Sequence, residues 1–166
     1  MPTVSTWPSG YTLPPMASWD DVAEAVPDLA ARVRTLFETQ KHMTLATLRR
    51  DGSPRISGTE VRFEDGELWL GMMAGSLKAR DLQRDPRLAV HGPTVDAPPD
   101  DPSAWAGDAK IAGRAVEVTD PPEADGSHRF RIDITEVVHT RVGTPADHLA
   151  IESWHPGRGS QRLERR

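Results

Sequence analysis

The sequence predicts a mainly β domain: a small antiparallel barrel of six or seven strands with a few appended helices. Short runs of alternating apolar and polar residues recur from residue 43 almost to the C-terminus, and tight turns join the first three of them. Helical spacing of apolar residues occurs only before the first of these runs and between the third and the fourth. A closed barrel is favoured for such strands because closure removes exposed sheet edges.

The composition argues against several classes of protein. The 166 residues carry a net charge of −5 and no cysteine, and the six histidines show neither HxH nor HExxH spacing. Nucleic-acid binding, which usually needs a basic face, and metal binding are therefore not expected. The N-terminus has no basic start with an apolar core, and no apolar run approaches the ~20 residues of a membrane span. We therefore expect a cytoplasmic protein without a membrane partner.

The N-terminal part, residues 1–26, is predicted to be an arm followed by a short helix, ahead of a barrel domain over residues 27–166. Proline and glycine are frequent between residues 8 and 15, which indicates an extended segment that Trp7 and Tyr11 are expected to anchor. Ser18 precedes two acidic residues and is a candidate N-cap for the short helix.

A second helix is expected to begin at Pro27, because proline is favoured in a first helical turn, and to end near residue 40. Its apolar residues share one helical face and are Leu29, Val33, Leu36 and Phe37.

The strands are expected from changes to a two-residue period. The predicted ranges are 43–48, 54–63, 67–73, 87–91, 108–119, 129–140 and 150–154, and residues 161–165 are a candidate for pairing back. Asp51-Gly52 and Asp65-Gly66 are typical of the tight turns that make the first three strands a meander. Gly113 lies inside a strand and predicts a bulge or bend.

The most informative stretch runs from Leu68 to Pro86, where an apolar strand breaks at Gly75-Ser76 and continues as a helix. A helix start leaves backbone N–H groups unpaired and carries the positive end of the helix dipole, so it favours an anion. Lys78 adds a full charge at the same place. We therefore expect an anion to bind at this junction, with the phosphate of a flat redox cofactor as the working hypothesis.

Alternatives remain open for several of these residues. Ser76 is also a common type of N-cap, and Lys78 would then be an ordinary solvated side chain. Arg55 would either lie near the cofactor or pair with an acid such as Glu60 or Glu67. Gly58, with Thr59, would mark either a bulge or a close approach of the backbone to a ring.

Three stretches resemble the pyridoxamine 5′-phosphate oxidase-like family of flavin-binding split barrels. They read MTLATLRRDGSPRIS (43–57), ELWLGMMAGSLKARDLQRDPRLAV (67–90) and AKIAGRAVEV (109–118). The first resembles the family's opening hairpin, and the third resembles its "G.A..V" strand. The second resembles the strand, small-residue turn and "S.K...L..DPR" helix, and it is the specific one. The likeness covers roughly residues 30–155.

The resemblance implies a homodimeric FMN-binding split barrel with cofactor sites at the subunit interface. It implies that FMN, or the related deazaflavin coenzyme F-420, lies in a groove with its phosphate near the start of the helix. Deazaflavin-specialised members often carry extra basic residues at this turn, whereas Ser76 and Leu77 precede Lys78 here, which favours FMN. The residues expected to bind the cofactor are Arg55, Ile56, Ser57, Gly58, Gly71, Met72, Ser76, Lys78, Arg80 and Trp154.

The expected function is that of an FMN-dependent oxidoreductase acting on a small planar conjugated substrate. In such an enzyme the cofactor carries the chemistry, so no side chain is assigned as a catalytic acid or base. The C-terminal run 154–159 only loosely resembles the pattern of members that oxidise pyridoxamine phosphate, and that substrate is not assigned. An F-420-dependent reductase of the same fold, and a non-catalytic flavin- or haem-binding module, remain as alternatives.

Overall fold

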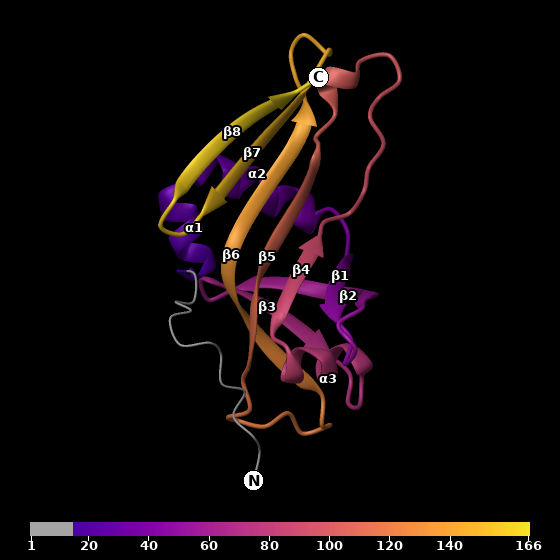
Figure 1. Cartoon of the computed structure of the whole chain (residues 1–166), viewed down its shortest axis with the longest axis vertical. Helices are drawn as coiled ribbons and strands as arrows, with labels where there is room; N and C mark the ends of the chain where they lie inside the picture. Colours follow the sequence, from indigo (N-terminus) through magenta and orange to yellow (C-terminus); the bar gives the residue numbers. More distant parts are fainter. Residues whose placement is uncertain (1–14) are drawn as a thin grey trace.

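The computed structural model describes residues 15–166, so the expected anchors Trp7 and Tyr11 lie outside the described residues. One antiparallel sheet has the strand order β3-β2-β1-β4-β5-β6-β7-β8, and β3 also pairs with β6. That pairing closes six strands into the predicted barrel and leaves β7 and β8 as an extension (Figure 1). The strands are β1 (His42–Leu48), β2 (Pro54–Glu64), β3 (Glu67–Met72), β4 (Arg87–His91), β5 (Asp108–Glu117), β6 (His128–Val142), β7 (Leu149–His155) and β8 (Gly159–Arg165).

The helices also follow the predicted order, and they are α1 (Trp19–Ala25), α2 (Pro27–Glu38) and α3 (Leu77–Arg84), with a 3-10 turn at η1 (Pro102–Ala104). Ser18 caps α1: its hydroxyl accepts from the Asp21 N–H, and the Asp21 carboxylate accepts from the Ser18 N–H. Within residues 15–166, no helix is long and apolar enough to cross a bilayer.

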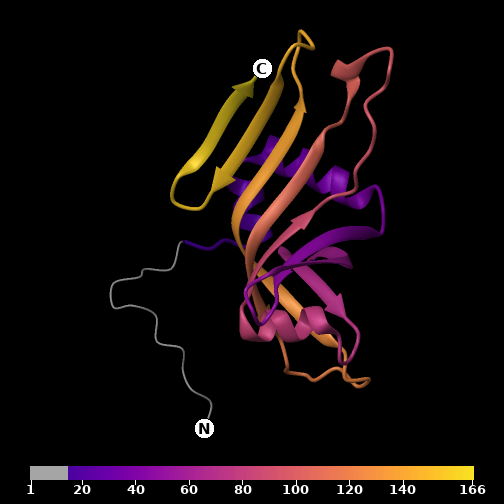
Figure 2. The same ribbon diagram turned by 45° about the vertical axis from the view of Figure 1, so that its right-hand side comes forward.

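The core fills the barrel and continues under α1 and α2. Its largest fully buried apolar side chains include Leu45, Leu70, Ile111, Phe130 and Ile132. Figure 2 shows α2 behind the upper parts of β5 and β6, and β6 is the strand that joins the barrel to its extension.

The two N-terminal helices reach the barrel through aromatic contacts at the β2–β3 turn. Trp19 and Phe37 meet Phe63 edge-on, with ring centroids 4.6 Å and 6.0 Å apart. Figure 1 places α3 at the opposite end of the molecule from the tips of β7 and β8, against β1 and β5.

Gly113 lies beside a bulge, as its place inside the strand predicts, and the extra residue is Thr135 of β6. The register between β5 and β6 shifts between Ala112 and Gly113. A Cβ at Gly113 would lie 2.5 Å from the carbonyl oxygen of Asp133 and 2.8 Å from Cγ2 of Ile132. The absence of a side chain therefore allows β5 and β6 to stay paired through the bend.

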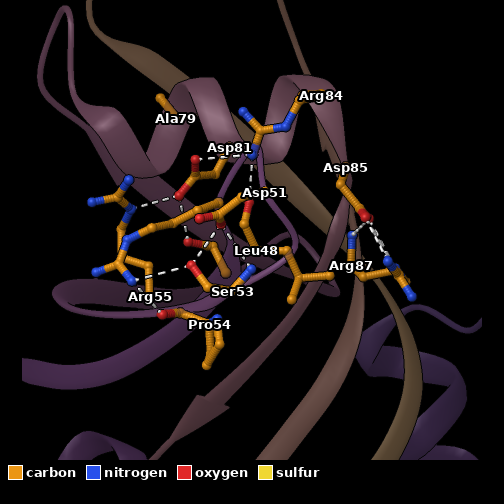
Figure 3. A network of polar contacts seen from close by, with 12 residues as sticks. Leu48, Asp51, Ser53, Pro54, Arg55, Ala79, Asp81, Arg84, Asp85 and Arg87 are labelled. Carbon is orange, nitrogen blue, oxygen red and sulfur yellow. Dashed lines mark hydrogen bonds and ion pairs between the residues drawn. The ribbon is translucent and has the colours of Figure 1, made fainter.

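A buried carboxylate fixes α3 to the barrel (Figure 3). Asp81 is 3% exposed, and Oδ2 accepts from the Thr47 hydroxyl of β1 at 3.0 Å and from Arg55 Nε of β2 at 2.6 Å. Its Oδ1 accepts from Arg84 at 3.0 Å. Burial disfavours the charge, but the bonds from Arg55, Arg84 and Thr47 outweigh it and hold the pKa of Asp81 below its usual value.

Replacing Asp81 should loosen this helix. We expect Asp81→Asn to lower the free energy of unfolding by about 2–4 kcal/mol at neutral pH, because it removes the charge that two arginines face. Urea denaturation would measure the loss. Glu38→Gln breaks the exposed pair with Arg34 on α2 and should cost less than about 0.5 kcal/mol. Similar losses in the two variants would contradict the role of Asp81.

The Asp81 carboxylate should also make the free energy of unfolding depend on pH in the acidic range. The pKa of Asp81 is lower in the folded chain than the value of about 3.9 expected in the unfolded chain. Its contribution is therefore fully present above that value and is lost as the pH falls through the folded pKa. As the pH falls from 5 to about 2, the free energy of unfolding of the wild type should decrease more than that of Asp81→Asn. Parallel plots of this free energy against pH for the two proteins would show that the Asp81 carboxylate is not involved.

The bulge gives a second prediction for stability. Gly113→Ala should lower the free energy of unfolding by about 1–3 kcal/mol, because the new methyl group meets backbone atoms that cannot move without disturbing the pairing. Gly58→Ala places the same methyl group where no atom lies within 4 Å, and it should leave stability unchanged within about 0.5 kcal/mol. Equal losses in the thermal melts would rule out this explanation.

Candidate functional site

An open groove of about 870 Å³ runs along β2 and β3 to the turn that leads into α3. Along both strands, residues that face the groove alternate with residues that face the barrel interior. Exposed Gly58 and Gly71 are groove-facing, whereas the side chains of Thr59, Leu70 and Met72 are buried. The volume is within the range of sites that hold cofactors and other small ligands.

Two glycines form the floor of this groove. Gly71 pairs with Glu60, two residues along β2 from Gly58, so the two glycines are diagonal neighbours on one face. A Cβ at either would meet no atom within 4 Å. The pairing of β1 with β2 runs through Gly58 and Thr59 without a register shift, so this position is not a bulge. The floor is a stretch of bare backbone that a planar group fits.

One end of the groove is built from the first turn of α3. Ser76 is the N-cap, and its hydroxyl oxygen accepts from the Ala79 N–H at 3.2 Å. The hydroxyl hydrogen stays available for a ligand. The N–H groups of Leu77 and Lys78 have no acceptor within the helix because they lie in its first turn. Donors therefore converge at this end, where the helix dipole is positive.

Lys78 lies over the glycine floor. Its Nζ donates to the carbonyl oxygen of Gly58 at 2.5 Å. Burial lowers the pKa of Lys78, and the nearby Glu60 carboxylate partly opposes that effect. Glu60 itself pairs with Lys41 at 3.1 Å, so much of its charge is already balanced outside the groove. A phosphate beside Lys78 would meet a partly desolvated ammonium, where ion pairing is stronger than in bulk water.

The far end of the groove carries an aromatic ring and two arginines. Trp69 donates from Nε1 to the Glu64 carbonyl oxygen at 3.1 Å, which fixes the plane of the indole. The guanidinium of Arg129 lies 3.9 Å from the centroid of that ring. Arg62 pairs with Trp69 across β2 and β3 and also lines the groove. This end is therefore cationic and aromatic.

A histidine–carboxylate pair lies beside α3. His128 also lines the groove, and its Nδ1 lies 2.7 Å from Oε1 of Glu117. Gln83 of α3 donates to both oxygens of the same carboxylate, at 3.1 and 2.9 Å. Burial raises the pKa of Glu117, but the bonds from His128 and Gln83 outweigh it and lower that pKa. The pair joins α3 to β5 and β6. Within residues 15–166, no group of three or more such side chains is placed to hold a metal ion.

The structure brings half of the sequence-predicted site residues together in this groove. Those that line it are Gly58, Gly71, Met72, Ser76 and Lys78. Ser76 is an N-cap, and it also faces the groove; its contact with a phosphate stays a prediction.

The other predicted residues lie outside the lining. Arg55 forms an ion pair, but with Asp81 rather than with Glu60 or Glu67. Ile56 lies two residues from Gly58 on the same face of β2 and is 74% exposed. Ser57 is half-buried, Arg80 is exposed, and Trp154 is buried in the core. Their contact with a cofactor remains a prediction.

Several groove residues were missed from sequence. Arg62 and Trp69 lie at even steps from Gly58 and Gly71, so the two-residue period of the strands could have found them. Arg129 and His128 come from β6, which reaches β3 only through barrel closure, and no local pattern signals that pairing.

Solved structures share this fold. PhzG from Burkholderia lata 383, in complex with tetrahydrophenazine-1-carboxylic acid, is 13% identical and matches with a TM-score of 0.57 over 88% of this chain and 87% of its own. A pyridoxamine 5′-phosphate oxidase-related, FMN-binding protein from Nostoc punctiforme PCC 73102 is 13% identical, with a TM-score of 0.56 over 86% and 96%. General Stress Protein 26 from Bacillus anthracis str. Sterne is 17% identical, with a TM-score of 0.51 over 66% and 91%.

No curated protein matches the chain. The family model described as pyridoxamine 5′-phosphate oxidase matches residues 29–151, a span that runs from α2 to β7 and includes the groove with both of its ends. This match agrees with the barrel topology and with the strand–turn–helix junction at Ser76. The chain belongs to the pyridoxamine 5′-phosphate oxidase family.

Proposed function

We propose that the protein is an FMN-binding oxidoreductase that acts on a small planar conjugated substrate. The observation that carries this proposal is the groove itself, in which a bare glycine floor leads to a cluster of anion donors at the start of α3. Membership of the family, and the description of the Nostoc protein as FMN-binding, support the choice of cofactor.

The chain's own residues would bind and orient the cofactor. Ser76 would donate its hydroxyl hydrogen to the phosphate, together with the N–H groups of Leu77 and Lys78. The Lys78 ammonium would add a charge-assisted bond. Gly58 and Gly71 would let the ring system approach the backbone, because no side chain stands above them. A bound flavin supplies hydride or electron transfer, and the protein supplies position and electrostatics.

The proposal includes a homodimer with the cofactor at the subunit interface. Large apolar side chains are exposed around the groove: Ile56 is 74% exposed, Met73 81% and Leu77 56%. Met73 lines the groove, Leu77 opens α3, and Ile56 continues the face of Gly58. Exposed apolar patches of this kind commonly mark interfaces, and a second copy would cover them and enclose the cofactor.

Cofactor titration tests the function. The purified protein should bind FMN, and Lys78→Ala should weaken binding about 10- to 150-fold, the effect of losing about 1.5–3 kcal/mol of a charge-assisted phosphate contact. Riboflavin, which lacks the phosphate, should bind both forms alike. Lys110→Ala on β5 removes a lysine outside the groove lining and should leave FMN affinity unchanged.

Parallel titrations with coenzyme F-420 and haem separate the alternatives within the fold. Failure to bind FMN would defeat the proposal, and unchanged FMN affinity in Lys78→Ala would defeat the placement of the phosphate. Turnover would then be tested by mixing the reduced holoprotein with planar conjugated acceptors such as quinones.

Oligomeric state can be tested separately by light scattering after size exclusion. The wild type should have the mass of a dimer, and Ile56→Glu should shift it toward a monomer, because a charge replaces an exposed apolar contact. FMN affinity should fall in the same variant. A monomeric wild type that still binds FMN would contradict the interface and leave the cofactor site intact.

A further inference from the structure

The cationic end of the groove, made of Arg62, Trp69 and Arg129, is not used by the phosphate site. It lies on the same face as the glycine floor but at the opposite end from α3. Arg129 pairs with Gly71 across β6 and β3, and Trp69 stands two residues from Gly71. Strand geometry separates the backbone of Gly58, which Lys78 bonds, from that of Arg129 by about 12 Å. One groove therefore has cationic side chains at both ends with bare backbone between them, and its lining also includes Glu60, Glu64, Glu123 and Asp125.

The charges at this end are only partly neutralised by the chain. Within the described part of the chain, the Arg62 side chain has neither a hydrogen bond nor an ion pair, although its backbone pairs with Trp69. Arg129 meets Glu64 at 3.9 Å, beyond hydrogen-bonding distance, and the two side chains are 40% and 53% exposed. Such a pair contributes little to stability. The guanidinium groups therefore keep unused donors that face the groove.

The position of Arg129 is nevertheless well defined. Its guanidinium stacks on Trp69, and the Trp69 indole is held by its bond to the Glu64 carbonyl oxygen. A guanidinium stacked on an aromatic ring loses conformational freedom before any ligand arrives, and it still presents its edge to a carboxylate. A planar ligand at this point would find an aromatic edge and two forked donors together.

We propose that this end of the groove recognises the carboxylate of a planar aromatic substrate. Arg129 and Arg62 would bind the carboxylate, Trp69 would keep Arg129 in place, and the aromatic part would extend toward the glycine floor. The inference rests on the proposed function, since the substrate would meet the cofactor on that floor. The substrate class is then aromatic carboxylates rather than neutral planar compounds.

A matched pair of probes tests this recognition. 2-Naphthoate and 2-naphthamide share shape and differ in charge, and calorimetry can measure their binding to the FMN-loaded protein. The naphthoate should bind at least about 10-fold more tightly, as expected for charge-assisted bonds to guanidinium. Arg129→Gln should remove most of that preference, and Arg62→Gln should reduce it, while the affinity for FMN stays unchanged.

Arg34→Gln provides the matched control. Arg34 also lies over an aromatic ring, 5.3 Å from the Phe63 centroid, and also pairs with a glutamate, but it belongs to α2 and does not line the groove. This variant should keep the full preference for the carboxylate. Equal affinity of the wild type for both probes would overturn the inference, and so would an unchanged preference in both groove variants.

The same titrations on cofactor-free protein separate the two proposals. Preference for naphthoate in a protein that does not bind FMN would support the carboxylate site and defeat the proposed function. Binding of FMN without any preference for naphthoate would do the reverse. Circular dichroism of each variant establishes that it is folded, and Arg62→Gln decides the matter if Arg129→Gln does not fold.

Discussion

The Asp81 carboxylate is the interaction on which the functional end of this molecule depends. A buried charge is stable only when its hydrogen-bonding capacity is filled, and here Thr47, Arg55 and Arg84 fill it from β1, β2 and α3 itself. The short helix α3 has only a narrow buried face, so packing alone gives it few anchors. The network sets where its first turn points, and that turn carries Ser76 and Lys78.

The groove results from the placement of α3 together with two glycine positions in the sheet. Gly58 of β2 and Gly71 of β3 both line the groove, with no atom above them within 4 Å. This flat stretch of backbone lies next to the hydrogen-bond donors at the start of α3. Cationic side chains lie at both ends of the groove; of the acids that line it, Glu60 pairs with Lys41 and Glu64 lies 3.9 Å from Arg129. In the proposed dimer, a second copy of the chain would cover the exposed apolar residues around it.

Much of the fold could be predicted from the sequence because local chemistry specifies it. Asp51-Gly52 and Asp65-Gly66 define the meander, Pro27 opens α2, and the β5–β6 register shifts beside Gly113. The strand–turn–helix junction could be found in the same way. The far end of the groove could not, because Arg129 reaches Trp69 only when β6 closes the barrel on β3. The partner of Arg55 was also missed. Asp81 is a charged residue of an amphipathic helix, which the sequence alone would place on the surface, whereas in the structure it is buried and pairs with Arg55.

We propose that the first turn of α3 holds the phosphate of a flavin. Hydrogen exchange of individual backbone amides, followed by NMR with FMN and with riboflavin, tests it most directly. FMN should slow exchange at Leu77 and Lys78, whose N–H groups have no acceptor within the helix, whereas riboflavin should leave these two amides unchanged. Equal protection of these two amides by both ligands, or protection by FMN confined to other parts of the chain, would contradict this placement of the phosphate.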